Sequence, residues 1–166
     1  ETAHGAKGRV EPVPTDGDYS IFIDYAVTPD AIENVLTTLR GIAPKRLVML
    51  FGAGGDRDRK KRPIMGKLSA DIADFVIVTS DNPRTEDPMS IIEEILPGVR
   101  AGKAPYKVIC DRPEAIRWAI DHHEPGDVIL LCGKGHEDYQ IIGHEKIHMD
   151  EREIVADYLA ERAKRT

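Results

Sequence analysis

The sequence predicts an α/β fold in which a mostly parallel β-sheet is covered by helices on both faces. Short, almost continuous apolar runs alternate with stretches whose apolar residues recur at helical spacing, and polar loops separate them. Strands joined by helices run parallel, and strands that are apolar throughout are buried on both faces. A change of pattern near the C-terminus predicts an antiparallel edge hairpin there. Together these observations describe a Rossmann-like domain.

The N-terminal third contains the first strand–helix unit. Residues 9–13 are a candidate short strand, and residues 20–26 contain the apolar run of the next strand. Thr28 is a suitable N-cap with Pro29 at the first helical position, and Gly41 ends the helix. The apolar side chains at helical spacing are Ile32, Val35, Leu36 and Leu39.

Two more units follow in the middle of the chain. The strand expected over residues 46–51 leads through a glycine-rich loop to a helix that Pro63 opens, and residues 75–79 form the next strand. The helix after that strand is expected to end at Pro97, because proline interrupts a helix. The apolar faces are Met65, Leu68 and Ile72 in the first helix, and Met89, Ile92 and Leu96 in the second.

The next unit supplies two more strands. They are expected over residues 106–110 and 127–132, and both are apolar. The helix between them begins near Pro113 and ends before Pro125. Its buried face is expected to contain Ile116, Ala119 and Ile120.

The pattern changes after Glu137. Residues 139–142 and 146–148 flank a turn at Gly143, which predicts the hairpin. Asp150 and Glu153 resemble a capping box that starts a last helix. That helix is expected to bury Ile154, Val155, Tyr158 and Leu159.

Length and composition indicate one ordinary globular domain. The chain has 166 residues, of which 41% are hydrophobic and 31% charged, and its net charge is −6. That charge, without a basic stripe interleaved with aromatic residues, argues against nucleic acid as a partner. We see no signal peptide and no apolar run of membrane length. Cys110 and Cys132 each end an apolar run, which is more typical of buried free cysteines in a reducing compartment than of a disulfide framework. We therefore expect a cytoplasmic domain over residues 9–166, preceded by a linker or truncated boundary at residues 1–8.

Four loops that follow predicted strands carry unusual polar residues. They contain Asp24-Tyr25, residues 52–58, residues 79–88 and residues 133–138. Parallel strands place their carboxyl ends at one edge of the sheet, where ligands bind in open α/β folds. We therefore expect the polar side chains of the four loops to converge in space.

The loop over residues 79–88 is the one around which the others are arranged. Pro83 fixes its own backbone and restricts Asn82, which stiffens the loop and directs the side chains of Asp81 and Arg84. A carboxylate can bind an ammonium group, and a guanidinium can grip a carboxylate through two parallel hydrogen bonds. The loop thus predicts a site for a zwitterion, although a turn before a helix with a solvated ion pair has the same composition.

Two other loops supply a second pair of charges. Glu137 is a candidate for a second ammonium group, because Gly133 and Gly135 allow the backbone to approach a ligand closely; otherwise it is a solvated acid. Arg57 is either a second carboxylate clamp or one charge of a basic run that continues to Arg62. Two acids and two arginines at one edge match a ligand with more than one amino-acid head group.

Three familiar motifs are incomplete in this sequence. Arg57 stands where the dinucleotide fingerprint requires its third glycine, and the segment Gly133-Lys134-Gly135 lacks the remainder of a Walker A loop. His144 and His148 match the HExxH pattern of zinc peptidases, but that chemistry requires a helix. Here the segment is typical of a strand, which would place the two residues about 13 Å apart at roughly 3.3 Å per residue. We expect no metal site.

The four loops together resemble the C-terminal domain of the Mur ligases. The resemblance covers nearly the whole chain and rests on Asp24-Tyr25-Ala26 with Thr28-Pro29-Asp30, residues 54–58 with Lys61-Arg62-Pro63, Asp81-Asn82-Pro83-Arg84, and residues 133–137. The Asp-Asn-Pro-Arg segment is similar to that of members that use meso-diaminopimelate rather than L-lysine. By this resemblance the substrate-binding residues are Arg57, Asp81, Asn82, Pro83, Arg84, Gly133 and Glu137.

The resemblance implies an ATP-dependent, amide-bond-forming ligase of peptidoglycan synthesis. In such enzymes ATP phosphorylates the D-glutamyl γ-carboxylate of UDP-MurNAc-L-Ala-D-Glu, and the amine of the incoming amino acid attacks the acyl phosphate. ATP and Mg²⁺ are bound mainly by the N-terminal and central domains, so this chain alone is expected to be inactive and to contain no catalytic residue. Asp24 and Tyr25 would face the nucleotide, with Val27 standing where the family has a histidine. The alternatives are the same ligase using L-lysine, or a non-catalytic amino-acid-binding module.

Overall fold

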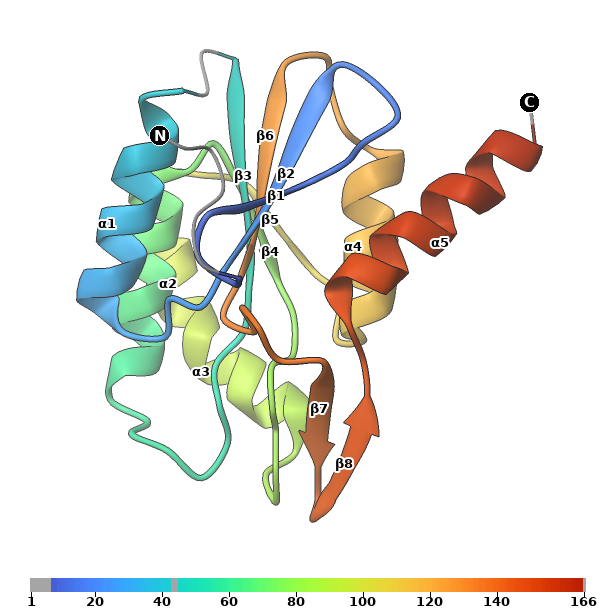
Figure 1. The fold of residues 1–166 in the computed structure, drawn as a ribbon. Helices are drawn as coiled ribbons and strands as arrows, with labels where there is room; N and C mark the ends of the chain where they lie inside the picture. The colour runs from blue at the N-terminus through green and yellow to red at the C-terminus, as the bar shows by residue number, and fades with distance from the viewer. Residues whose placement is uncertain (1–6, 43–44, 166) are drawn as a thin grey trace.

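A six-stranded sheet forms the centre of the structure, a computed structural model that describes residues 7–42 and 45–165 (Figure 1). Its strands are β1 Glu11–Val13, β2 Tyr19–Asp24, β3 Arg46–Phe51, β4 Phe75–Val78, β5 Tyr106–Val108 and β6 Asp127–Cys132. They are arranged in the order β1-β2-β6-β3-β4-β5, and all neighbours are parallel except β1 and β2. The mostly parallel sheet is therefore confirmed. Residues 1–6 of the expected boundary segment lie outside the described residues.

Helices cover both faces of this sheet, as predicted. They are α1 Pro29–Arg40, α2 Lys61–Ile72, α3 Pro88–Ala101, α4 Arg112–Asp121 and α5 Glu151–Lys164. Helices α1, α2 and α3 pack on one face, and α4 and α5 pack on the other (Figure 1). The side chains of Thr28 and Asp150 cap α1 and α5 as predicted, because they accept hydrogen bonds from backbone N–H groups in the first turns. Glu153, the other half of the predicted capping box, contacts His148 instead. No helix in the described ranges is long and apolar enough to cross a membrane.

The central strands are buried on both faces, which explains their continuous apolar sequences. In β3, Leu47, Met49 and Phe51 point toward α1–α3, whereas Val48 and Leu50 point toward α4 and α5. Every residue of β6 is buried. Burial on both faces leaves the carboxyl ends of the strands as the place where polar loops can gather.

The hairpin is confirmed, but its position differs from the prediction. Strands β7 Tyr139–Ile142 and β8 Glu145–His148 pair with each other in a separate two-stranded sheet that extends from the carboxyl edge (Figure 1). The reason is that β7 pairs with the loop after β4: the Arg84 N–H donates to the Ile141 carbonyl at 3.0 Å, and the Gly143 N–H donates to the Arg84 carbonyl at 2.7 Å. The antiparallel edge strand of the main sheet is β1 instead.

The second histidine of the HExxH sequence lies on a strand, as expected. His148 belongs to β8, and its Nε2 lies 2.8 Å from Glu153 Oε1, while His144 lies in the turn. In the described ranges no group of three or more His, Cys, Asp or Glu side chains is arranged to hold a metal ion. Cys132 is buried and Cys110 half-buried, and both are free thiols.

The prediction that α3 ends at Pro97 was wrong. The helix continues through Pro97 to Ala101. Gly98 lies against the backbone of α2, where a Cβ atom would come within 1.8 Å of the Pro63 carbonyl oxygen. Close packing between α2 and α3 therefore keeps the last turn helical despite the hydrogen bond that proline cannot donate.

Candidate functional site

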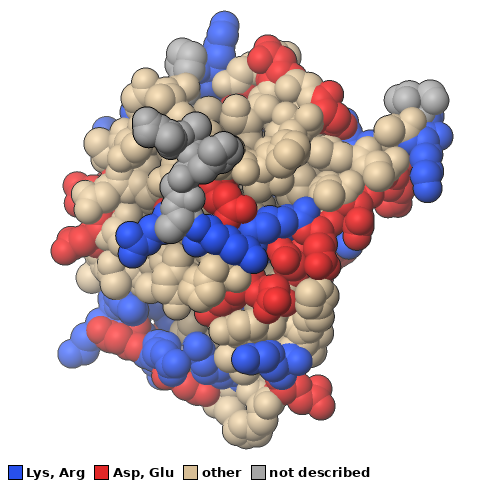
Figure 2. All heavy atoms as spheres, in the orientation of Figure 1, with Lys and Arg blue, Asp and Glu red and all other residues tan. Residues whose placement is uncertain are grey.

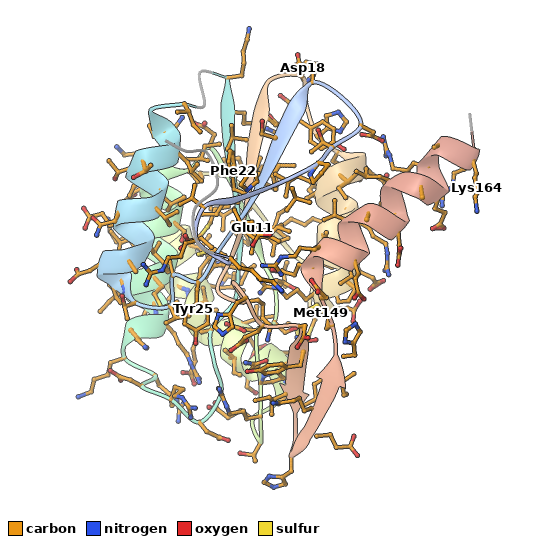
Figure 3. The ribbon with its side chains drawn as sticks, viewed as in Figure 1. Glu11, Asp18, Phe22, Tyr25, Met149 and Lys164 are labelled. Atoms are coloured by element: carbon orange, nitrogen blue, oxygen red, sulfur yellow. The ribbon has the colours of Figure 1, made fainter. Side chains whose placement is uncertain are left out.

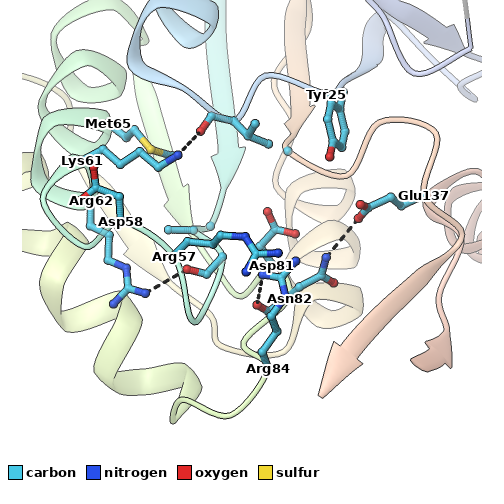
Figure 4. A pocket seen from close by; sticks show the side chains of 15 residues that line it. Tyr25, Arg57, Asp58, Lys61, Arg62, Met65, Asp81, Asn82, Arg84 and Glu137 are labelled. Atoms are coloured by element: carbon cyan, nitrogen blue, oxygen red, sulfur yellow. Dashed lines mark hydrogen bonds between the residues drawn. The ribbon is translucent and has the colours of Figure 1, made fainter. Parts of the chain in front are cut away.

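The four polar loops converge at the carboxyl edge, as predicted from the sheet topology. They surround a hollow of about 120 Å³ (Figure 4). Strand β6 lies between β2 and β3. The chain after β2 and after β3 leads to helices on one face of the sheet, whereas the chain after β6 leads to α5 on the other face. Loops that leave neighbouring strands toward opposite faces leave a crevice between them, where ligands bind in open α/β sheets. Of the predicted residues, those that line the hollow are Tyr25, Arg57, Asp81, Asn82, Arg84, Gly133 and Glu137.

Asn82 is the junction of the site. Its amide oxygen accepts hydrogen bonds from Lys134 Nζ at 2.6 Å and from the Ile141 N–H at 3.0 Å. Its amide nitrogen donates to Glu137 Oε1 at 3.2 Å, and Glu137 points toward it in Figure 4. Its backbone carbonyl accepts from the Gly55 N–H at 2.8 Å. One side chain and its backbone thus connect the loops after β3, β4 and β6 with β7.

Asp81 places a carboxylate in the hollow with unused hydrogen-bonding capacity. The residue is 6% exposed, and its Oδ1 has no hydrogen-bond partner among the described atoms, although Lys134 Nζ lies 3.7 Å away. Burial raises the pKa of this carboxyl, and the positive charges of Arg112 and Lys134 oppose that rise. Oδ1 itself is buried, but the residue lines the hollow, so its carboxylate is suited to receive a cationic or N–H group from a ligand there.

The hairpin holds this side of the site in place. Gln140 Nε2 donates to the Ser80 hydroxyl at 2.9 Å and to the Asp81 carbonyl at 2.6 Å. Ile141 adds two more hydrogen bonds, because its N–H donates to Asn82 Oδ1 and its carbonyl accepts from the Arg84 N–H. The hairpin therefore restrains the loop after β4 at Ser80, Asp81, Asn82 and Arg84. We call the side chains that this support positions the braced wall: Asp81, Asn82, Lys134 and Glu137.

Arg84 lies beside the braced wall in an unusual backbone conformation. Its φ is 53°, in the left-handed region that non-glycine residues rarely adopt. The two backbone hydrogen bonds to the hairpin maintain this conformation. The guanidinium donates to the Gly55 carbonyl at 3.0 Å and forms no ion pair with a described carboxylate. It is therefore held near the pocket with donors still free.

The loop after β3 forms the opposite side, which we call the open wall: Arg57 and Asp58. Both residues are exposed, and among the described residues the Arg57 guanidinium donates only to the carbonyl of Asp56, at 2.9 Å. The base of the loop is tight, because a Cβ on Gly55 would lie 1.8 Å from the Pro83 carbonyl oxygen. The open wall is thus anchored at its base and free at its tip.

Arg62 fastens that base to the loop after β4. Its side chain is 1% exposed and donates to the Gly54 carbonyl at 2.9 Å and to both carboxylate oxygens of Glu86, at 2.8 and 3.0 Å. The Arg62 hydrogen bonds, with one from the Asp56 N–H, lower the pKa of Glu86 to about 2. A bidentate pair of this kind fixes the relative position of the two loops.

A buried ion pair supports the braced wall from below. Arg112, at the start of α4, and Glu151, in the first turn of α5, are both fully buried, with Arg112 Nε 2.7 Å from Glu151 Oε2. The other guanidinium nitrogens donate to the carbonyls of Ser80 at 3.0 Å and Cys132 at 2.9 Å. Arg112 thereby joins the ends of β4 and β6.

Three residues singled out in the sequence lie outside the lining of the hollow. Asp24 does not line the hollow, because its carboxylate accepts the Val10 N–H at 2.8 Å and faces a neighbouring groove. Pro83 is buried behind the hollow. Gly135 is required by the fold and not by a ligand: its φ is 53°, and a Cβ there would lie 2.5 Å from the Tyr25 Cβ.

Tyr25 lies at the same end of the molecule as Met149, opposite Asp18 (Figure 3).

Three buried cations that hold the site together were not predicted from the sequence: Lys134, Arg62 and Arg112. In the sequence, Lys134 belongs to an incomplete Walker A loop and to the family-like residues 133–137, and Arg62 belongs to a basic run and to the family-like segment Lys61-Arg62-Pro63. A lysine between two glycines directly after a fully apolar strand is a signal that could have indicated burial.

The exposed charges are intermixed, with Lys and Arg beside Asp and Glu on the face in Figure 2.

Comparisons with known proteins place this chain in a family. Residues 8–135 match the family model described as Mur ligase, glutamate ligase domain. The chain is 54% identical over 158 residues to UDP-N-acetylmuramoyl-L-alanyl-D-glutamate–2,6-diaminopimelate ligase of Caldanaerobacter subterraneus subsp. tengcongensis, covering 95% of this chain and 33% of the relative. A relative of the same name from Trichormus variabilis is 54% identical over 162 residues, covering 96% of this chain and 32% of the relative.

The structural comparison agrees with the sequence comparison. A solved structure of a ligase with that name superposes with a TM-score of 0.88 at 40% identity, covering 97% of this chain and 33% of that one. The chain thus spans about one third of the length of these relatives. From the matched residues, the shared fold and the convergent loops, we conclude that the chain belongs to the Mur ligase family.

Proposed function

We propose that the chain is the amino-acid-binding domain of an ATP-dependent ligase that adds meso-diaminopimelate to UDP-MurNAc-L-Ala-D-Glu in the cytoplasm. The names of its relatives support this substrate. The observation that carries the proposal is the pairing, in one pocket, of an Asp81 carboxylate oxygen without a donor and an Arg84 guanidinium without a described carboxylate partner. Those two groups are complementary to an ammonium and a carboxylate on one carbon.

The proposed ligand has an amino-acid group at each end. Its distal ammonium would contact Asp81 and Glu137, and its distal carboxylate would contact Arg84, with Arg57 available for a further carboxylate. L-lysine has no distal carboxylate and would leave Arg84 without that partner. A site built to bind a polar group rejects an analogue that lacks it by about 10⁴-fold.

The contribution of this domain to the reaction would be to hold the nucleophile. ATP would convert the D-glutamyl γ-carboxylate into an acyl phosphate, and the amine of meso-diaminopimelate would displace phosphate to form the amide. Holding that amine in a reactive geometry is worth several kcal/mol, up to about 7–11 kcal/mol for ideal orientation. The segment Gly133-Lys134-Gly135 lacks the remainder of a Walker A loop, so it supplies no complete phosphate-binding motif for ATP. The proposal therefore assigns ATP and Mg²⁺ mainly to the other domains of the longer ligase.

Calorimetric titration of the chain with meso-diaminopimelate, and separately with L-lysine, tests the proposal. We expect heat with the first ligand only, and we expect Arg84→Ala to abolish it. Arg100→Ala is the matched control, since Arg100 lies on α3 and contacts Tyr106 instead of the pocket. A preference for L-lysine would contradict the diaminopimelate assignment.

Two alternatives can be separated from the proposal by further measurements. An L-lysine-adding ligase would release phosphate in the presence of L-lysine. A non-catalytic binding module would bind the amino acid without any phosphate release when the full-length protein is given ATP and UDP-MurNAc-L-Ala-D-Glu. If the isolated chain bound neither ligand, the same phosphate-release assay on the full-length protein would become the test.

A further inference from the structure

Lys134 is the most unusual residue of the site, because its side chain is fully buried. Lysine is rarely buried completely unless it is paired. Its Nζ lies 2.6 Å from Asn82 Oδ1, 2.8 Å from Glu137 Oε1 and 3.7 Å from Asp81 Oδ1. Two of these acceptors, on Glu137 and Asp81, are the ones that the proposed function assigns to the ammonium group of the ligand.

The charges of this cluster leave room for one more cation. Asp81 and Glu137 carry two negative charges when ionised, and Lys134 supplies one positive charge. Lys134 makes close contacts with Asn82 and Glu137 but none shorter than 3.7 Å with Asp81. Asp81 Oδ1 consequently remains without a hydrogen bond in the described structure.

We propose that Lys134 is a positioning residue: it holds Asn82 and Glu137 in the ligand-binding arrangement and leaves Asp81 to receive the cationic group of the ligand. The inference rests on the proposed function for the ligand's identity, but it requires only that the ligand carries an ammonium group. Because Lys134 donates to Asn82 Oδ1, the amide nitrogen of Asn82 is directed toward Glu137. Without Lys134, the Asn82 amide oxygen keeps the Ile141 N–H as a donor, and Glu137 keeps Asn82 Nδ2 and the Tyr139 hydroxyl, but both lose their charged partner.

Removal of Lys134 also changes the electrostatics around Asp81. Asp81 faces Lys134 and Glu137 from the loop after β6, Arg112 from α4 and Glu151 from α5. Lys134 and Arg112 oppose the rise that burial imposes on the pKa of Asp81. In a variant without Lys134 the pKa of Asp81 rises further, so binding of a cation becomes coupled to proton release and strengthens as pH increases.

The test uses the full-length ligase and measures phosphate release while meso-diaminopimelate or L-lysine is varied across the neutral pH range. We expect Lys134→Met to raise the KM of the amino acid about 30-fold or more, with a smaller change in kcat. That KM is expected to fall with increasing pH more steeply than in the wild type. Propylammonium is expected to restore the KM of Lys134→Ala, because it can occupy the space and the charge of the missing side chain.

Lys146→Met is the matched control. Lys146 Nζ lies 4.2 Å from the centre of the Tyr139 ring, and Lys134 Nζ lies 5.2 Å from the same centre, but Lys146 is exposed. The control removes the same charge beside the same ring without touching Asn82 or Glu137. We expect its KM to stay within about twofold of the wild type, as for other exposed charges.

Different results separate the two proposals. Wild-type turnover with L-lysine alone would contradict the proposed substrate, and the Lys134 variants would then be judged with L-lysine. An unchanged KM in Lys134→Met, or a raised KM that neither depends on pH nor responds to propylammonium, would overturn the positioning role. Wild-type turnover with neither amino acid would overturn both, since no ammonium-bearing ligand would remain for this site.

Discussion

The two walls of the pocket both carry charged residues predicted to contact the ligand, but they are built differently. In the braced wall, Asp81, Asn82 and Lys134 are buried and bonded to one another, to the hairpin or to both. In the open wall, Arg57 is exposed, and its one partner in the described part of the chain is a neighbouring backbone carbonyl. A ligand that contacts the braced wall meets groups already in position, whereas Arg57 must lose conformational freedom on binding.

This difference suggests a division of labour between the walls. A prearranged set of charges discriminates strongly between ligands, because a ligand that lacks one complementary group leaves a buried charge unpaired. A mobile arginine at the surface contributes less to affinity, but it can follow the ligand as it enters. We therefore expect substitutions at the braced wall and its support to have larger effects than substitutions at the open wall.

The largest effect is expected at the support of the braced wall. Arg112→Met leaves Glu151 as an unpaired, fully buried carboxylate and is expected to lower the free energy of unfolding by about 3–5 kcal/mol. Urea denaturation of the chain measures this loss. The double variant Arg112→Met/Glu151→Met should recover most of the stability, because it removes both charges. A loss below about 1 kcal/mol in the single variant would show that the ion pair does not support the site.

A smaller effect, visible through its pH dependence, is expected at the base of the open wall. The pKa of Glu86 is lowered from about 4.5 to about 2, mainly by the Arg62 hydrogen bonds. Because the folded-state pKa is the lower one, this stabilisation is present above pH 4.5 and is lost as pH falls toward 2.

Glu86→Gln should therefore be less stable than the wild type above that window, and the difference should shrink as the pH falls through it. Urea denaturation at a series of pH values measures the difference. Glu93→Gln, on the exposed side of α3, serves as the control. A constant difference between wild type and Glu86→Gln over the whole range would show that ionisation of Glu86 is not responsible.

The smallest effect is expected at the tip of the open wall. Arg57→Ala should change the free energy of unfolding by less than about 0.5 kcal/mol, because the side chain is exposed and has one backbone contact. Its affinity for meso-diaminopimelate should fall by about fivefold or less, as for an exposed ion pair. Calorimetric titration of Arg57→Ala and of Arg84→Ala with meso-diaminopimelate tests which substitution costs more affinity. A greater loss in Arg57→Ala than in Arg84→Ala would reverse the comparison between the walls.

Much of the fold was predictable from local patterns. The continuous apolar runs identified β3, β4 and β6, and the cap at Thr28 marked the start of α1. The failure at Pro97 has a tertiary cause, because packing of Gly98 against α2 outweighs the local preference of proline. The hairpin was predicted correctly, but it forms a separate two-stranded sheet, since its partner is the Arg84 backbone in a distant loop.

The sequence by itself determined the succession of strands and helices, and therefore the edge at which Asp81, Arg84 and Glu137 meet. These features follow from residue spacing and from the direction of parallel strands. Only the tertiary structure decided which charges are buried and what they face. Lys134 and Asn82 are 52 residues apart in the chain, and Arg112 and Glu151 are 39 apart. A buried charge is tolerated because of partners that folding brings to it, and no local pattern contains those partners.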